Sequence, residues 1–244
     1  MKHTHSSYRK FVRFAILGAL IVLPTASTRA ASIFTETWPT DGDFRAWLGS
    51  TLGIGGPNAH TVSGGAVNFN VAMGGGPFLR GYQLDAAYVV RNASDGAFEG
   101  NTITAGAKSV QFDFALDSDS LGTAENPMLV LFMGGVGAGG LNNYWEYRVT
   151  PPAVSSGFTT VVAGLTDSTG WVQTLGTGSF AEATQNVQSW AIQYRRFQPG
   201  GPNSGFSASG RVDNFALSTA VPEPSASLLM GLFGGLILWR RTRR

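Results

Sequence analysis

The chain has 244 residues, no cysteine, and a formal net charge of +2 at pH 7. The positive balance comes from the two ends, because residues 31–220 contain 8 Lys and Arg against 14 Asp and Glu, a net charge of −6. An acidic middle disfavours binding to nucleic acid, which depends on clustered Lys and Arg. The lack of cysteine excludes disulfides, thiol catalysis and thiolate metal sites.

Residues 1–30 have the three parts of a secretory signal peptide. Basic residues are concentrated in residues 1–13, an apolar run covers residues 14–23, and small residues follow Pro24, with cleavage expected after Ala30. The apolar run is about half of the roughly 20 residues that a bilayer-spanning helix needs, which disfavours an N-terminal membrane anchor. We therefore expect residues 31–220 to be exported, and this length is sufficient for one domain with its own core.

The middle of the chain is predicted to be all-β. Apolar and polar residues alternate with period two at 67–71, 110–114 and 190–194, as in strands with one buried face. Further strands are predicted at 127–133, 144–149, 158–163 and 212–217, with a helical turn within 180–187. This spacing favours an antiparallel two-sheet jelly-roll sandwich. The glycine-rich runs 74–76 and 134–140 predict flexible loops.

The first and last predicted strands carry a short resemblance. Residues 33–38, Ile-Phe-Thr-Glu-Thr-Trp, and residues 212–217, Val-Asp-Asn-Phe-Ala-Leu, resemble the terminal strands of galactose-binding-like and laminin-G-like jelly rolls. The resemblance implies that the two strands lie close together and that acidic residues there hold a structural calcium, with Glu36 and Asp213 as candidate ligands. The alternative is two surface carboxylates, because calcium takes six to eight oxygen ligands.

Catalytic and metal signatures are sparse between the two ends. His60 is the only histidine of residues 31–220, which excludes a histidine-based zinc site. Asp113, Asp117 and Asp119 lack the glycine and terminal glutamate of an EF-hand loop, so this segment predicts a polar turn. Glu146 is flanked by aromatic residues and would suit a glycoside hydrolase, but the sequence indicates no partner carboxylate. No catalytic residue is therefore assigned.

Aromatic and charged side chains alternate in residues 144–148, Tyr-Trp-Glu-Tyr-Arg. Aromatic rings stack on the C–H faces of sugars, and neighbouring polar groups bind the hydroxyls. We therefore predict a sugar-binding site that includes Tyr144, Trp145, Glu146 and Arg148. The other large aromatic residues that could stack on a sugar are Trp38, Trp47, Tyr82, Trp171 and Tyr194. Most of the large aromatic residues are expected in the core.

The last 24 residues, 221–244, have three parts in a fixed order. They are a short motif, an apolar run over residues 226–239, and a terminal arginine cluster of Arg240, Arg241, Arg243 and Arg244. The motif is Val221, Pro222, Glu223 and Pro224. This arrangement resembles the PEP-CTERM sorting tail. The resemblance implies recognition by an exosortase, a membrane-embedded cysteine protease of Gram-negative bacteria that make exopolysaccharide.

The apolar run of this tail predicts a weak or temporary membrane helix. Its 14 residues span about 21 Å, which is less than the hydrocarbon core of about 30 Å. The arginines stay cytoplasmic under the positive-inside rule. We expect transient anchoring in the inner membrane and then delivery to the outer surface or extracellular matrix. The alternative is a tail anchor that is never processed.

These features favour a non-catalytic surface or matrix protein that interacts with exopolysaccharide or envelope glycans. No cofactor is expected apart from the calcium that the jelly-roll resemblance implies. Two alternatives remain, a secreted polysaccharide hydrolase on the same sandwich and a structural component without a ligand.

Overall fold

The computed structural model describes residues 32–52, 58–73, 79–87, 93–120, 127–137, 140–197 and 206–219. The predicted signal peptide, the sorting tail and the glycine run at 74–76 lie outside these described residues. Within them, no helix is long and apolar enough to cross a membrane.

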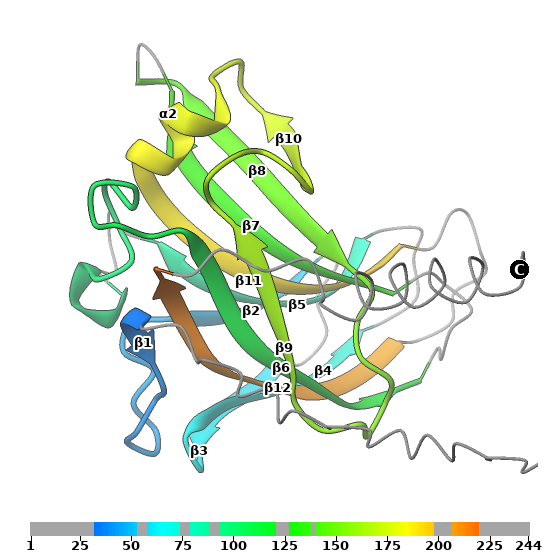
Figure 1. Ribbon diagram of the computed structural model, residues 1–244. Coiled ribbons are helices and arrows are strands. Elements are labelled where there is room, and N and C mark those ends of the chain that lie inside the picture. The colour runs from blue at the N-terminus through cyan, green and yellow to red at the C-terminus, as the bar shows by residue number, and fades with distance from the viewer. Residues whose placement is uncertain are drawn as a thin grey trace, which may run out of the picture.

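The described residues form two antiparallel sheets of six strands each (Figure 1). Sheet A has the order β3 (Asn58–Ser63), β4 (Ala66–Met73), β12 (Phe206–Ser218), β6 (Ser109–Asp119) and β9 (Thr159–Gly164), with β1 (Ser32–Glu36) also paired to β12. Sheet B has the order β10 (Trp171–Leu175), β8 (Asn142–Val149), β7 (Met128–Val136), β11 (Val187–Phe197), β5 (Leu79–Ala87) and β2 (Leu48–Leu52). The prediction of an all-β antiparallel two-sheet fold is confirmed.

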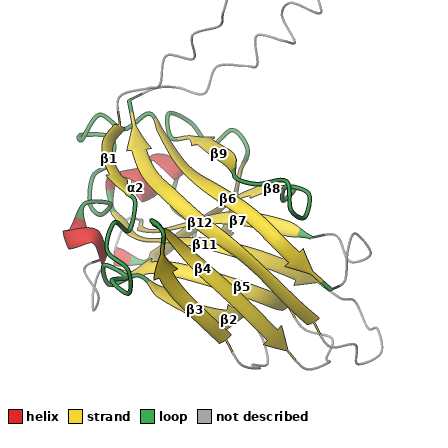
Figure 2. Ribbon diagram, turned by 90° about the horizontal axis from the view of Figure 1, so that it is seen from below, coloured by secondary structure: helices red, strands yellow, loops and turns green. Residues whose placement is uncertain are grey.

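The chain moves repeatedly between the two sheets. It passes from β4 in sheet A to β5 in sheet B, returns for β6, and repeats the exchange at β7, β9, β10 and β12. The first and last strands pair antiparallel, with Glu36 opposite Phe215, so the expected closeness of the terminal strands is confirmed. Figure 2 shows the strands of sheet A crossing in front of those of sheet B.

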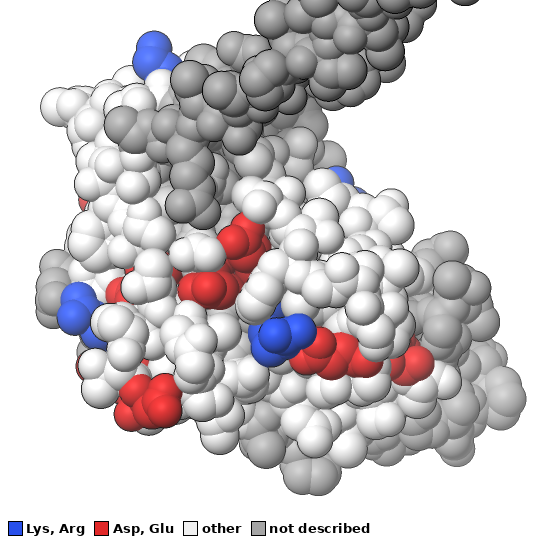
Figure 3. All heavy atoms as spheres, turned by 60° about the horizontal axis from the view of Figure 1, so that its bottom comes forward, with Lys and Arg blue, Asp and Glu red and all other residues white. Residues whose placement is uncertain are grey.

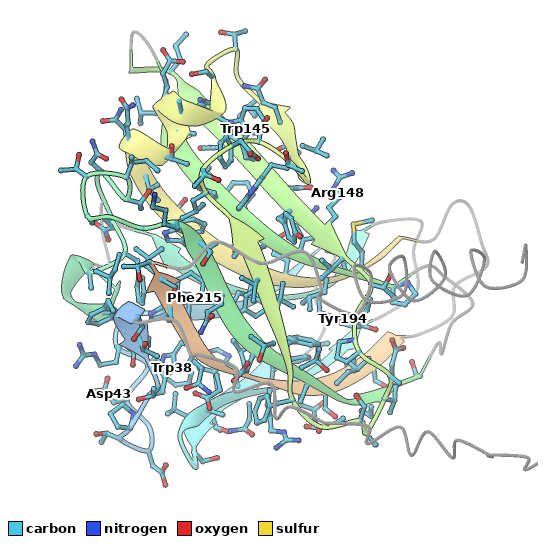
Figure 4. All side chains as sticks on the ribbon, in the orientation of Figure 1. Trp38, Asp43, Trp145, Arg148, Tyr194 and Phe215 are labelled. Carbon is cyan, nitrogen blue, oxygen red and sulfur yellow. The ribbon has the colours of Figure 1, made fainter. Side chains whose placement is uncertain are left out.

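The core between the sheets is rich in aromatic side chains. Trp38 and Trp47 meet edge to face at 5.5 Å between ring centroids, and Trp47 meets Phe215 at 5.0 Å. Figure 4 labels Trp38 and Phe215. Such edge-to-face pairs add to the large apolar area that each ring buries. Trp171 and Tyr194 are also buried, as predicted, whereas the side chain of Tyr82 lies outside the described part. The period-two alternation at 67–71, 110–114 and 190–194 matches the buried faces of β4, β6 and β11.

A short helix, α2 (Phe180–Gln185), confirms the predicted helical turn. Ser179 and Glu182 form a capping box, in which Glu182 N–H donates to the Ser179 hydroxyl at 3.2 Å and Ser179 N–H donates to the Glu182 carboxylate at 2.6 Å. Phe180 and Ala183 are buried. The helix therefore packs an apolar side against the core, and the two sheets supply most of the fold.

The prediction of a flexible loop at residues 134–140 is wrong for its first residues. Gly134 and Gly135 belong to β7. A Cβ on Gly135 would lie 2.7 Å from Ala183 Cα, and one on Gly134 would lie 2.3 Å from Ser189 Oγ. The missing side chains allow α2 and the neighbouring strand to approach β7 closely, which is a packing role for glycine.

The predicted polar turn at residues 113–119 is also wrong, because this segment is the second half of β6. Phe112, Phe114 and Leu116 are buried, while Asp113, between the two phenylalanines, and Asp117, after Leu116, lie on the other face of the strand. The apolar alternation therefore decides the secondary structure here. Asp113 and Asp117 occupy the solvent side of sheet A, whereas Asp119 accepts a hydrogen bond from the hydroxyl of the buried Tyr194.

Candidate functional site

Strand β8 presents different residues on its two faces because successive side chains point in opposite directions. Tyr144, Glu146 and Arg148 lie on the face away from the core, whereas Trp145 packs against the core, with its ring 5.2 Å from that of Phe180. Figure 4 shows Trp145 and Arg148 on this strand. Of the four residues in the predicted sugar-binding site, the structure brings three together and places Trp145 on the opposite side.

The register of sheet B extends this surface across β7 and β11. Phe132 of β7 lies opposite Glu146, and Val130 lies between Arg148 on one side and Gln193 of β11 on the other. Residues directly opposite each other in antiparallel strands share a face of the sheet. Three strands therefore contribute to one surface, which we call the outer face of sheet B.

An ion network joins β8 to β11 on this face. Glu146 Oε2 accepts from Arg148 Nε at 2.9 Å and is 2.8 Å from Arg148 Nη2, while Glu146 Oε1 accepts from Arg195 Nη2 at 2.8 Å. Arg195 Nε also donates to Gln193 Oε1. The exposed fractions of the side chains are 7% for Glu146, 15% for Arg195 and 42% for Arg148. One nearly buried carboxylate thus fixes two guanidinium groups.

The environment of Glu146 keeps its carboxyl group ionised. Burial raises the pKa of Glu146, but hydrogen bonds and charges from Arg195 and Arg148 outweigh burial and hold the pKa below its usual 4.5. A general acid needs a raised pKa. Among the side chains described on this face, Glu146 is the only carboxylate.

An aromatic pair lies beside the network. The rings of Tyr144 and Phe132 are 5.2 Å apart between centroids at an angle of 62°, and both residues are half-buried. The hydroxyl of Tyr144 has no hydrogen-bond partner in the described part of the chain. The outer face of sheet B therefore combines aromatic surface with fixed hydrogen-bond donors.

Sequence reasoning missed Phe132, Gln193 and Arg195. Arg195 lies 49 positions after Glu146 in the chain and meets it only because β11 and β8 flank β7. Residues 193–197, Gln-Tyr-Arg-Arg-Phe, also combine aromatic and charged residues, but this local pattern does not indicate that Arg195 meets Glu146. Strand register, which the sequence did not indicate, was the missing information.

The two candidate calcium ligands have separate environments. The carboxylate of Glu36 accepts hydrogen bonds from Trp38 N–H at 2.9 Å and from Ser94 Oγ at 2.5 Å. Glu36 is opposite Phe215 of β12, so it lies on the core-facing side of sheet A. Asp213 lies on the outer face of sheet A, so the structure does not bring the two carboxylates together. Among the described residues there is no group of three or more His, Asp or Glu that could hold a metal ion.

Asp213 instead belongs to a polar cluster on sheet A. It lies opposite Asp113, and the side chain of Asn214 donates to Asp113 at 2.8 Å and to Asp213 at 3.2 Å. Burial raises the pKa of Asp213, a hydrogen bond from the Asn214 backbone lowers it, and the charge of Asp113 raises it further. Figure 3 shows acidic side chains gathered in the middle of this side of the molecule.

No family model matches the chain, and no curated protein matches it. Among solved structures it is similar to a family 11 carbohydrate-binding module from Clostridium thermocellum in complex with a β-1,3-1,4-mixed-linked tetrasaccharide. In that comparison the TM-score is 0.45 and the identity 14%, with 72% of this chain and 90% of the module covered. It is also similar to an agarase, with a TM-score of 0.44, 8% identity, and 78% of this chain and 24% of the agarase chain covered. A structure of carbohydrate-binding modules of the β-sandwich superfamily gives a TM-score of 0.39 and 14% identity. That comparison covers 71% of this chain and 57% of the other chain.

Proposed function

We propose that this chain is a non-catalytic exported protein that binds glycan on the outer face of sheet B. The observation that carries the proposal is the placement of Tyr144 and Phe132 next to the network of Arg148, Glu146 and Arg195 on one surface. Aromatic rings suit the C–H faces of sugars, and fixed donors suit their hydroxyls and oxygens.

The arginines of this face are held in position before any ligand arrives. Glu146 anchors Arg148 within β8 and Arg195 on β11, and Gln193 adds a second contact to Arg195. Donors that are already ordered lose less conformational freedom on binding, so they contribute more affinity. The strands on either side of β7 supply a rigid base for the arrangement.

The topology and the chain ends complete the proposal. The repeated exchange of strands between the sheets supports a jelly-roll arrangement. By resemblance, Pro222, Glu223 and Pro224 direct the chain to an exosortase, which places the domain at the outer surface or in the extracellular matrix. The glycan in reach there is exopolysaccharide or an envelope glycan.

Affinity electrophoresis tests the binding proposal. The full chain, purified in mild detergent, is run through gels that contain the producing cell's own exopolysaccharide. We expect retardation that Tyr144→Ala weakens about tenfold, since a lost ring contact is worth about 1.4 kcal/mol. Phe158→Ala is the matched control, because Phe158 is an exposed aromatic residue outside sheet B, against Arg211. Absent retardation, or equal retardation of Tyr144→Ala and wild type, contradicts the proposal.

Intact mass measurement in the native host tests the sorting part. We expect the wild-type chain to lose most of residues 221–244, and a variant with alanine at Pro222, Glu223 and Pro224 to keep them. The reason is that the two prolines hold this segment extended, as a protease cleft requires. A full-length tail in both proteins means that the tail acts as a plain membrane anchor.

A further inference from the structure

On the outer face of sheet B, Arg148, Arg195 and Glu146 form a cluster that is positively charged in an acidic domain. The three side chains of this cluster sum to a charge of +1, and the next acidic position of the sheet in this row is Asp85 of β5, opposite Ala191 of β11. The domain as a whole, residues 31–220, has a net charge of −6. The positive charge is therefore local to this cluster of β8 and β11.

The opposite side of the sandwich has the opposite sign. The strands of sheet A place Asp113, Asp117, Asp213 and Arg211 on its outer side, which sum to −2. Figure 3 shows the acidic side chains of this side, with a single basic group beside a row of acidic ones. An anionic group is thus repelled by the acidic side chains of sheet A and attracted to the two arginines of sheet B.

The two arginines of sheet B also keep unused hydrogen-bond donors. A guanidinium group has five N–H donors. Arg148 uses Nε and Nη2 on Glu146, and Arg195 uses Nη2 on Glu146 and Nε on Gln193. In the part of the chain that the structure describes, the Nη1 group of neither arginine has a partner. Both side chains reach solvent, with exposed fractions of 42% and 15%.

We infer that the outer face of sheet B binds an acidic polysaccharide, with a uronate carboxylate of the polymer on Arg148 and Arg195. The inference rests on the proposed glycan binding and names its substrate class. Ionised acceptors such as carboxylates pair more strongly with guanidinium donors than the neutral hydroxyls of a sugar do. A neutral sugar would satisfy the same donors but would leave the positive charge uncompensated.

The geometry assigns a separate task to the aromatic end of the face. Tyr144 lies four residues before Arg148 on the same strand, a distance of about 13 Å along β8. A polymer that follows the strand reaches both residues with different sugar units. Tyr144 then supplies stacking that is independent of charge, and Arg148 with Arg195 supplies the preference for a carboxylate.

A pair of polymers with the same backbone tests the inference. Polygalacturonate carries a carboxylate on each sugar, and its methyl-esterified form is neutral. We expect the full chain in mild detergent to bind polygalacturonate about tenfold more tightly, equivalent to about 1.4 kcal/mol. Added salt should reduce this difference, because exposed charges are screened. Arg148→Gln should remove the preference, and Arg211→Gln, the matched control on sheet A, should keep it.

The outcomes separate this inference from the proposed function. If both polymers bind equally and Tyr144→Ala weakens this binding, the preference for an acidic polymer is overturned and the proposed glycan binding remains. Binding that Tyr144→Ala leaves unchanged, or no binding of either polymer, overturns both. An equal loss for Arg148→Gln and Arg211→Gln means general attraction by net charge, which also overturns the assigned site.

Discussion

Replacing Glu146 by glutamine removes the negative charge between two guanidinium groups and keeps the shape of the side chain. Breaking a buried ion pair costs roughly 3–5 kcal/mol, and breaking an exposed pair costs about 0–1 kcal/mol. Glu146 and Arg195 are nearly buried, but Arg148 is 42% exposed and can turn to water. We therefore expect Glu146→Gln to lower the free energy of unfolding by about 2 kcal/mol, which lowers Tm by about 4–8 °C.

The effect has a defined pH dependence. The pKa of Glu146 is lower in the folded protein than its usual 4.5, because the two arginines favour the charged carboxylate. The carboxylate therefore stabilises the fold fully at pH values above the pKa that Glu146 has in the unfolded chain. This stabilisation is lost as the pH falls through the pKa of Glu146 in the folded protein. We expect the Tm difference between wild type and Glu146→Gln to be constant near pH 7 and to close below about pH 4.

Thermal unfolding followed by circular dichroism measures both effects. Asp117→Asn is the matched control, because Asp117 and Arg211 form a bidentate pair at 2.9 and 3.0 Å with exposed fractions of 40% and 37%. This exposed pair should contribute at most about 1 kcal/mol. If the two variants lower Tm equally, or the Glu146→Gln difference persists in acid, the reasoning about the buried network is wrong.

Two further changes test the packing and the electrostatics elsewhere. Gly135→Ala should lower the denaturant midpoint by the equivalent of about 1–3 kcal/mol, because the new Cβ would lie 2.7 Å from Ala183 Cα. Gly137→Ala is the control and should cost less, because its Cβ would lie 3.3 Å from Gly178 Cα. Equal effects of the two substitutions contradict the prediction. Burial raises the pKa of Glu99, so the stability of the wild-type chain falls as the pH rises above about 4.5. Glu99→Gln should therefore raise Tm at pH 7 and leave it unchanged at pH 4, and a pH-independent shift contradicts this reasoning.

Periodicity predicted the strands well where one face is strongly apolar. Residues 110–114 and 190–194 fall inside β6 and β11, and their apolar members line the core. The same signal was overlooked at residues 116–119, where the aspartates suggested a turn although Leu116 continues the buried face. Gly134 and Gly135 could not be placed in a strand from local sequence, because the reason for them is the close approach of Ser189 on β11 and of Ala183 on α2.

The candidate site was predicted only as far as one strand extends. Tyr144, Glu146 and Arg148 are neighbours in sequence, so their pattern was visible. Phe132 and Arg195 reach the site through the pairing of β7 with β8 and β11, which no local pattern encodes. Trp145 was included by composition, although period-two alternation already placed it on the other face from Tyr144.

This separation of faces on β8 makes stability and binding independent. Trp145 packs its ring against Phe180 and donates from Nε1 to Asn143 Oδ1 at 2.9 Å, so Trp145→Ala should lower the free energy of unfolding by about 3 kcal/mol. Tyr144→Ala loses the contact with Phe132 and should lower it by about 1 kcal/mol.

Glycan affinity should follow the opposite order. At 20 °C, with folding checked by circular dichroism, the Trp145→Ala protein should retain wild-type affinity, because its cavity lies on the core side of the strand. Tyr144→Ala should lose about tenfold. A folded Trp145→Ala protein that loses binding would contradict the placement of the glycan on the outer face of sheet B.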